Sequence, residues 1–195
     1  MKKVFLSIAI VTAGLFVASC GSKAASPATE ASEEQQTEAE ATVPDGFKTH
    51  EFAHFSIALP DEFTTGSDAS SDNATFSSEA TLTLENGEEV SSSANINCGF
   101  MSGGATPAQI KETAATLKAS QEATGETCDE PIIDGNIILM RHWYDPGEGY
   151  KVITWRWWIV SDDGKNVAGN IYYPDTQAKY YDGMAQKIVK SIKIK

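Results

Sequence analysis

A run of residues from Tyr150 to Ser161 is apolar on both of its alternating faces and holds three of the four tryptophans. Period-two alternation puts Trp155 and Trp157 on one face and Arg156 and Trp158 on the other. A strand without a solvated face belongs inside a sheet that is covered on both sides. We therefore predict a central strand here, with helices or long loops above and below it.

The same run lies within a predicted three-strand meander. Residues 132–144, 150–161 and 166–173 have strand-like patterns, and turn-forming residues 145–149 and 162–165 separate them. If these short connections set the register, Trp157 lies opposite Gly169, and Trp155 lies opposite Ile171 and beside Leu139. A glycine across from an indole leaves room for the ring to lie flat.

Stretches upstream of the meander also have strand patterns. Phe55, Ile57 and Leu59 alternate with smaller residues, so residues 47–60 are expected to form a strand that ends at Pro60. Residues 64–78 are polar and predict a loop that encloses a short strand at 74–77. Residues 81–84 and 90–101 predict two further strands, joined by a turn at Glu85-Asn86-Gly87.

Two helices are predicted from their end signals. Thr106-Pro107-Ala108-Gln109 combines a capping box with a proline at the first helical position, and Gly125 supplies a C-terminal stop. The helix between them has a thin apolar stripe of Ile110, Ala114 and Leu117. A second helix follows Pro174-Asp175, and one of its faces carries Tyr181, Met184, Ile188 and Ile192.

The N-terminal segment has the pattern of an export signal. Lys2 and Lys3 precede an uncharged, largely apolar stretch at 4–17, which is shorter than the roughly 20 residues that a membrane span requires. Val17-Ala18-Ser19-Cys20 resembles the lipobox of bacterial lipoproteins. This resemblance implies that residues 1–19 are a signal peptide and that Cys20 carries diacylglycerol and a further acyl chain such as palmitate, which anchors the protein to a membrane. An ordinary secretory signal is the alternative.

The remaining chain divides by composition. Residues 20–42 are rich in Glu, Ala, Ser and Thr and contain no large apolar side chain, so they predict a disordered acidic tether. Residues 43–195 suffice for one domain, which carries 22 acidic and 12 basic side chains. This balance argues against nucleic acid as a partner. We expect a lipid-anchored protein of the bacterial cell envelope, with its domain outside the cytoplasm.

The order of the predicted elements resembles that of the Mog1/PsbP-like family. The similar pieces are Phe55-Ser-Ile-Ala-Leu-Pro60, followed by an acidic turn, and a final helix that ends in Ile188-Val-Lys-Ser-Ile192. The resemblance implies an α+β fold, an α/β/α sandwich with a curved, mainly antiparallel sheet. It also implies a binding or assembly role toward other proteins, and it brings no catalytic residues.

Two cysteines, Cys98 and Cys128, remain in the domain. An even pair in an exported chain suggests a disulfide, here closing a loop of about 30 residues. Two free buried thiols are the alternative.

Four side chains of the meander form a candidate binding face. His142, Arg156, Trp158 and Tyr172 share the side of the sheet opposite to Trp155 and Trp157. If the helix that begins after Thr106 covers this side only in part, an aromatic and basic surface remains for a protein or small-ligand partner. If the helix covers it fully, these residues are structural and Arg156 extends to the rim.

His50-Glu51-Phe52-Ala53-His54 matches the HExxH motif of zinc proteases. That chemistry requires a helix, on which the two histidines share one face. This segment alternates like a strand, where residues four apart stand about 13 Å from each other. A zinc-dependent hydrolase through His50 and His54 is therefore only the alternative to our prediction, a non-enzymatic binding module without a cofactor.

Overall fold

The computed structural model describes residues 43–195, except 67–69, 71, 80, 84–86 and 92. The predicted signal peptide, the predicted tether and Cys20 lie outside the described residues. Neither helix in the described part of the chain is long and apolar enough to cross a lipid bilayer.

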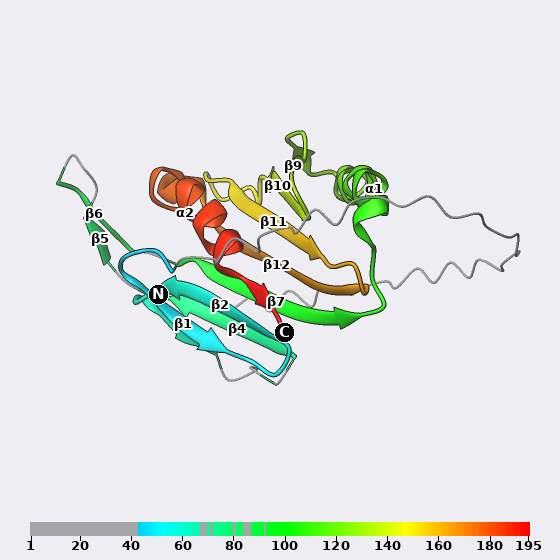
Figure 1. Ribbon diagram of the computed structural model, residues 1–195. Coiled ribbons are helices and arrows are strands. Elements are labelled where there is room, and N and C mark those ends of the chain that lie inside the picture. The colour runs from blue at the N-terminus through cyan, green and yellow to red at the C-terminus, as the bar shows by residue number, and fades with distance from the viewer. Residues whose placement is uncertain (1–42, 67–69, 71, 80, 84–86, 92) are drawn as a thin grey trace, which may run out of the picture. The chain divides into compact units, whose positions relative to one another are not determined.

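The main sheet has eight strands, all of whose neighbours are antiparallel (Figure 1). Their order is β3-β4-β7-β12-β11-β10-β8, and β9 also pairs with β10. The strands are β3 (Phe63–Thr65), β4 (Asn73–Ser78), β7 (Asn95–Ser102), β8 (Thr127–Cys128), β9 (Ile132–Asp134), β10 (Ile137–Tyr144), β11 (Val152–Val160) and β12 (Lys165–Pro174). The predicted meander is β10, β11 and β12, and its Trp-rich strand β11 lies inside the sheet as expected. The single strand expected at 132–144 is wrong, because the chain turns at 135–136 and its two parts, β9 and β10, pair as a hairpin.

A smaller sheet contains both ends of the domain. It consists of β1 (Phe47–Glu51), β2 (Phe55–Pro60) and β13 (Lys193–Ile194), in the order β1-β2-β13. The single strand expected at 47–60 is wrong, because the chain reverses at 52–54 and the two halves pair as a hairpin. All six residues of β2 are buried.

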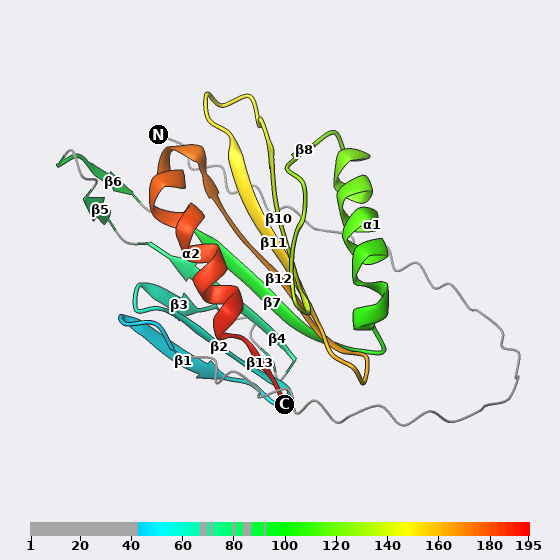
Figure 2. The ribbon, with the colours of Figure 1, turned by 45° about the horizontal axis from the view of Figure 1, so that its top comes forward.

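The strand expected at 90–101 is also two strands, which belong to different sheets. β6 (Glu89–Ser91) pairs with β5 (Thr81–Thr83) in a two-stranded sheet, whereas β7 lies in the main sheet. Figure 2 shows the β5–β6 hairpin projecting from the side of the domain.

The two helices lie on opposite faces of the main sheet. Helix α1 (Ile110–Glu122) follows a short 3-10 turn, and the predicted capping box forms, with the Thr106 amide donating to Gln109 Oε1 at 3.1 Å. It packs against β8, β9 and β10, while α2 (Ala178–Ser191) packs against β2, β11 and β12 (Figure 2). This arrangement is the expected α/β/α sandwich.

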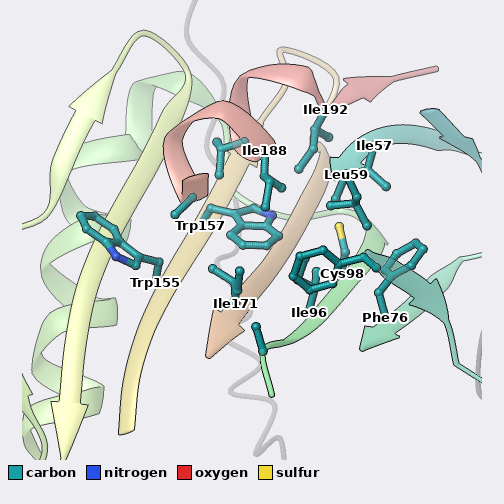
Figure 3. Packing of buried hydrophobic residues seen from close by; sticks show 14 of the residues in the cluster. Ile57, Leu59, Phe76, Ile96, Cys98, Trp155, Trp157, Ile171, Ile188 and Ile192 are labelled. Carbon is teal, nitrogen blue, oxygen red and sulfur yellow. The ribbon is translucent and has the colours of Figure 1, made fainter. Parts of the chain in front are cut away.

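The core lies between the main sheet and α2, and Trp157 is its largest fully buried side chain. Figure 3 shows its indole among Ile171, Ile188 and Ile96. The predicted register of β11 on β12 is confirmed: Trp157 faces Gly169, and Trp155 faces Ile171. The predicted neighbour of Trp155 on β10 is wrong, since Leu139 pairs with Trp157 and Arg141 pairs with Trp155. A Cβ at Gly169 would lie 2.6 Å from the indole carbon Cζ2, so only glycine lets the ring lie against β12.

A single carboxylate oxygen connects α2 to three strands. Asp182 Oδ1 accepts hydrogen bonds from Trp155 Nε1 at 2.8 Å, Tyr173 Oη at 2.7 Å and Arg141 Nε at 3.2 Å. Burial and the bond to Asp182 both raise the pKa of Tyr173. Because hydrogen bonds to a carboxylate are stronger than neutral ones, this cluster fixes α2 on the sheet.

The C-terminal residues close over β2. Ser191 Oγ accepts from the Ala58 amide at 2.9 Å, and the Lys195 amide donates to the His54 carbonyl at 2.9 Å. Together with the pairing of β13, these bonds attach the last residues of the domain to its first hairpin.

The predicted disulfide between Cys98 and Cys128 is wrong, since both are free thiols. Cys98 lies on β7 and Cys128 on β8, four strand positions apart in one sheet, or about 19 Å at the usual strand spacing. A disulfide requires Cα atoms within about 7 Å. Cys98 is buried, and burial raises its pKa to about 12, whereas Cys128 is only half-buried.

Candidate functional site

Within the part of the chain that the structure describes, one side of the main sheet is covered by a helix at one edge only. Thr75, Asn97, Asn170 and Arg156 are register partners on β4, β7, β12 and β11, and Tyr172 lies two residues from Asn170 on the same side. All five are half-buried. We call these five residues the open sheet face, because α1 packs beside them, on β8 to β10, and α2 lies on the opposite side.

The four residues of the predicted binding face do share this side of the sheet, but they have different surroundings. Trp158 packs with Ile110, Ala114 and Val160 under α1. With the Asn166 amide turned to satisfy both of its ends, Asn166 Oδ1 accepts from Trp158 Nε1 at 3.0 Å. Trp158 is therefore half-buried beneath α1, where it packs against the helix instead of forming part of an open surface.

His142 is 4% exposed and belongs to the interior. Its Nδ1 is hydrogen-bonded to Glu126 Oε2, and its Nε2 is buried without a hydrogen-bond partner among the described residues. Burial lowers the pKa of His142, and the charge of Arg156 adds to this effect, while Glu126 opposes it. The neutral imidazole with a proton on Nδ1 fits these contacts.

Arg156 is the unusual residue of this face. It is half-buried, yet it forms no hydrogen bond or ion pair with any residue that the structure describes. Burial lowers its pKa, and the charge of Glu126 opposes the shift. Removing a charge from water costs free energy, so a partly buried guanidinium gains from an anionic partner. The geometry thus leaves Arg156 able to bind an anionic group.

The neighbours of Arg156 on the open sheet face are neutral and polar. Asn97 Nδ2 donates to Asn170 Oδ1 at 3.4 Å, a long and weak bond. Burial raises the pKa of Tyr172, and the Asn97 amide opposes this shift. Amide and hydroxyl groups beside an arginine can hydrogen-bond a ligand from several directions. Of the four residues of the predicted face, Tyr172 and Arg156 therefore remain as candidates for binding, because His142 is buried and Trp158 packs under α1.

Sequence reasoning missed Thr75, Asn97 and Asn170. Asn170 lies on a strand that was predicted, but β7 and β4 join the sheet through long-range pairing, which local patterns do not encode. The alternation of Asn95 and Asn97 with the buried Ile96 and Cys98 was the available signal for a polar face.

The HExxH segment does not form a helix. His50 lies in β1 and His54 in the turn before β2. Their rings contact Phe76 and Phe100, and His54 Nε2 lies 3.4 Å from Asp72 Oδ1. The described residues contain no group of three or more His, Cys, Asp or Glu side chains placed to hold a metal ion. The placement that the zinc-protease motif needs is therefore not available here.

Two surface depressions lie away from Arg156. One, of about 520 Å³, is lined by residues that include Thr127, Trp143 and Lys151. The other, of about 320 Å³, lies between α1 and the edge strand β9, where Ile133 is 40% exposed. Neither includes a residue of the open sheet face.

Comparison with known proteins identifies the fold. No protein-family model and no curated sequence matches the chain. A mutant of the protein Mog1 aligns with a TM-score of 0.54 and 13% sequence identity, over 76% of this chain and 95% of that chain. The Ran-binding protein Mog1p of Saccharomyces cerevisiae aligns with a TM-score of 0.53 and 11% identity, over the same shares. The fold is Mog1-like. The predicted α+β class and sandwich architecture are confirmed.

Proposed function

We propose that this chain is a lipid-anchored lipoprotein of the bacterial cell envelope whose Mog1-like domain is a non-enzymatic binding module for another protein. The observation that carries the binding role is the open sheet face, where Arg156 is half-buried without a partner among the described residues. One protein of the same fold is named a Ran-binding protein, which supports a protein partner as the general role of such a domain.

The anchoring part of the proposal rests on Val17-Ala18-Ser19-Cys20 and the basic and apolar residues before it. Cells that express the chain should incorporate labelled palmitate into it, and Cys20→Ser should abolish the label. A Ser19→Ala variant, which keeps the cysteine and a small residue before it, should remain labelled. Unlabelled wild-type protein would refute lipid anchoring and leave the binding role untouched.

The binding part can be tested by photo-crosslinking in cells that produce the full lipidated chain. The photoreactive amino acid p-benzoyl-phenylalanine would replace Tyr172 on the open sheet face and, as a matched control, the exposed Lys187 on the outer side of α2. We expect a discrete protein adduct from position 172 that position 187 does not give. Equal labelling patterns from both positions would contradict a specific partner at this face.

A further inference from the structure

We propose that the open sheet face receives an acidic side chain from the partner polypeptide and that the carboxylate of this side chain pairs with Arg156. The proposal rests on the proposed function, because it names the chemistry by which that partner is recognised. The site is assembled from strands β4, β7, β11 and β12 and is not among the motifs that the sequence displays.

Arg156 needs an anion that the described part of the domain does not supply. Glu126 is the acidic group whose charge acts on Arg156, but its carboxylate is bound to His142. Burial disfavours the charged guanidinium. A carboxylate from outside can form two parallel hydrogen bonds with it, and this pair would offset the cost of removing the guanidinium from water.

The residues that pair with Arg156 across the sheet, and their own partners, carry no charge, and Glu126 is the acidic group whose charge reaches Arg156. The register partners Thr75, Asn97, Asn170 and Met140 are all neutral, although the whole chain has a net charge of −12. An acidic residue can therefore approach this part of the surface with little repulsion from its immediate neighbours, whereas the acidic remainder of the domain repels it.

A single cation selects a single carboxylate rather than a polyanion. Nucleic acids and anionic membrane surfaces are bound through several lysines and arginines that contact successive phosphates. Arg156 is the one basic side chain among the five residues of the open sheet face. The chemistry on this face thus suits one aspartate or glutamate within an otherwise polar segment.

The width of the open sheet face suits a polypeptide segment. The four strands from β4 to β11 span about 14 Å, which accommodates one helix of roughly 10–12 Å diameter beside α1. Arginine and tyrosine are also the residue types that most often dominate protein interfaces.

The test uses the adduct from p-benzoyl-phenylalanine at position 172 of the full lipidated chain. Arg156→Gln should reduce the adduct about tenfold or more, since loss of a desolvated charge pair at an interface weakens binding at least that much. Lys151→Gln, which removes an exposed cation just before β11, should leave it unchanged. Circular dichroism melting of each variant establishes that the domain is folded.

A charge exchange then identifies the pair. Once mass spectrometry locates the crosslinked segment, each Asp or Glu in it is changed to Arg and combined with Arg156→Glu. We expect one exchange to restore the adduct that Arg156→Glu alone abolishes. An adduct that Arg156→Gln leaves intact, a crosslinked segment without an acidic residue, or an adduct to a glycan would overturn this inference while keeping a binding role. A second variant carries p-benzoyl-phenylalanine at Thr75, on the β4 side of the open sheet face. The absence of any adduct from both position 172 and position 75 would overturn the binding role as well.

Discussion

Replacing Gly169 by alanine would insert one methyl group into the contact between β12 and the Trp157 indole. The added Cβ would lie 2.6 Å from Trp157 Cζ2 and 2.5 Å from the Asn97 carbonyl oxygen. Carbon atoms in proteins pack best at about 3.5–4.0 Å, so the methyl group is roughly 1 Å too close to both neighbours. One of these neighbours is the backbone of β7, which can shift only by distorting the sheet.

Two effects of opposite sign determine how much Gly169→Ala changes the free energy of unfolding. Alanine restricts the unfolded chain and on that account stabilises a protein by about 0.4–1 kcal/mol. Overpacking a closed core costs about 1–3 kcal/mol. Complete displacement of the indole would forfeit the burial of roughly 200 Å², or about 5 kcal/mol, which is the upper limit. We therefore expect Gly169→Ala to destabilise the domain by about 1–3 kcal/mol.

Gly183 provides a control with the same chemical change. It lies in α2, and no atom comes within 4 Å of the Cβ that alanine would add there. Gly183→Ala should stabilise the domain by about 0.5–1 kcal/mol, since alanine has the higher helix propensity. Urea unfolding curves of the three proteins, followed by tryptophan fluorescence, measure both changes in the free energy of unfolding.

The reasoning fails if Gly169→Ala is as stable as the wild type or if the two substitutions change stability in the same direction. A double-mutant cycle isolates the contact itself. Combining Gly169→Ala with Trp157→Leu should cost less than the sum of the single substitutions, because the smaller side chain removes one of the two clashes. If the free-energy changes of the two substitutions are strictly additive, the strain arises only from the contact of the added methyl group with the Asn97 carbonyl oxygen.

Three further measurements test other parts of the structure. Asp182→Ala should lower the free energy of unfolding by about 2 kcal/mol, because it leaves two largely buried donors without an acceptor, whereas the exposed Asp162→Ala should change it by under about 0.5 kcal/mol. In the absence of a reductant, a thiol reagent should modify Cys128 in the folded domain and should modify Cys98 only after the domain is unfolded. A mass spectrum that shows neither cysteine modified after unfolding would contradict the structure. Folding lowers the pKa of His142 below its unfolded value of about 6.5, so the unfolded state binds more protons and stability should fall as the pH drops from about 7.5 to 5. His142→Gln should flatten this pH dependence, and an unchanged slope would refute the assignment.

Local signals in the sequence were sufficient for the parts of the fold that form locally. The capping box at Thr106 and the positive φ of Gly125 bracket α1, and the short connection at 162–165 predicted the register of β11 on β12. The reversal at 52–54 was missed because Phe52-Ala53-His54 contains no glycine, proline or asparagine to mark a turn.

Long-range pairing accounts for the residues of the candidate site that were missed and for the wrong disulfide. Asn97 and Asn170 are neighbours in space although 73 positions separate them, and no local pattern encodes that β7 pairs with β12. The same long-range topology explains why the predicted disulfide is wrong, because the number of cysteines does not reveal which strands carry them. For the candidate site, sequence alternation placed four residues on one face, and only the position of α1 separated the packed Trp158 from the accessible Arg156.

The contacts of α2 and β13 with β2 make the folding of the domain depend on segments that lie far apart in the sequence. The buried strand β2 receives its second sheet neighbour from β13, and Ser191 satisfies the amide of Ala58 at its centre. Without α2 and β13, the apolar side chains of β2 would be uncovered. The core of the domain is therefore complete only when β2 and α2, which more than 100 residues separate in the sequence, have come together.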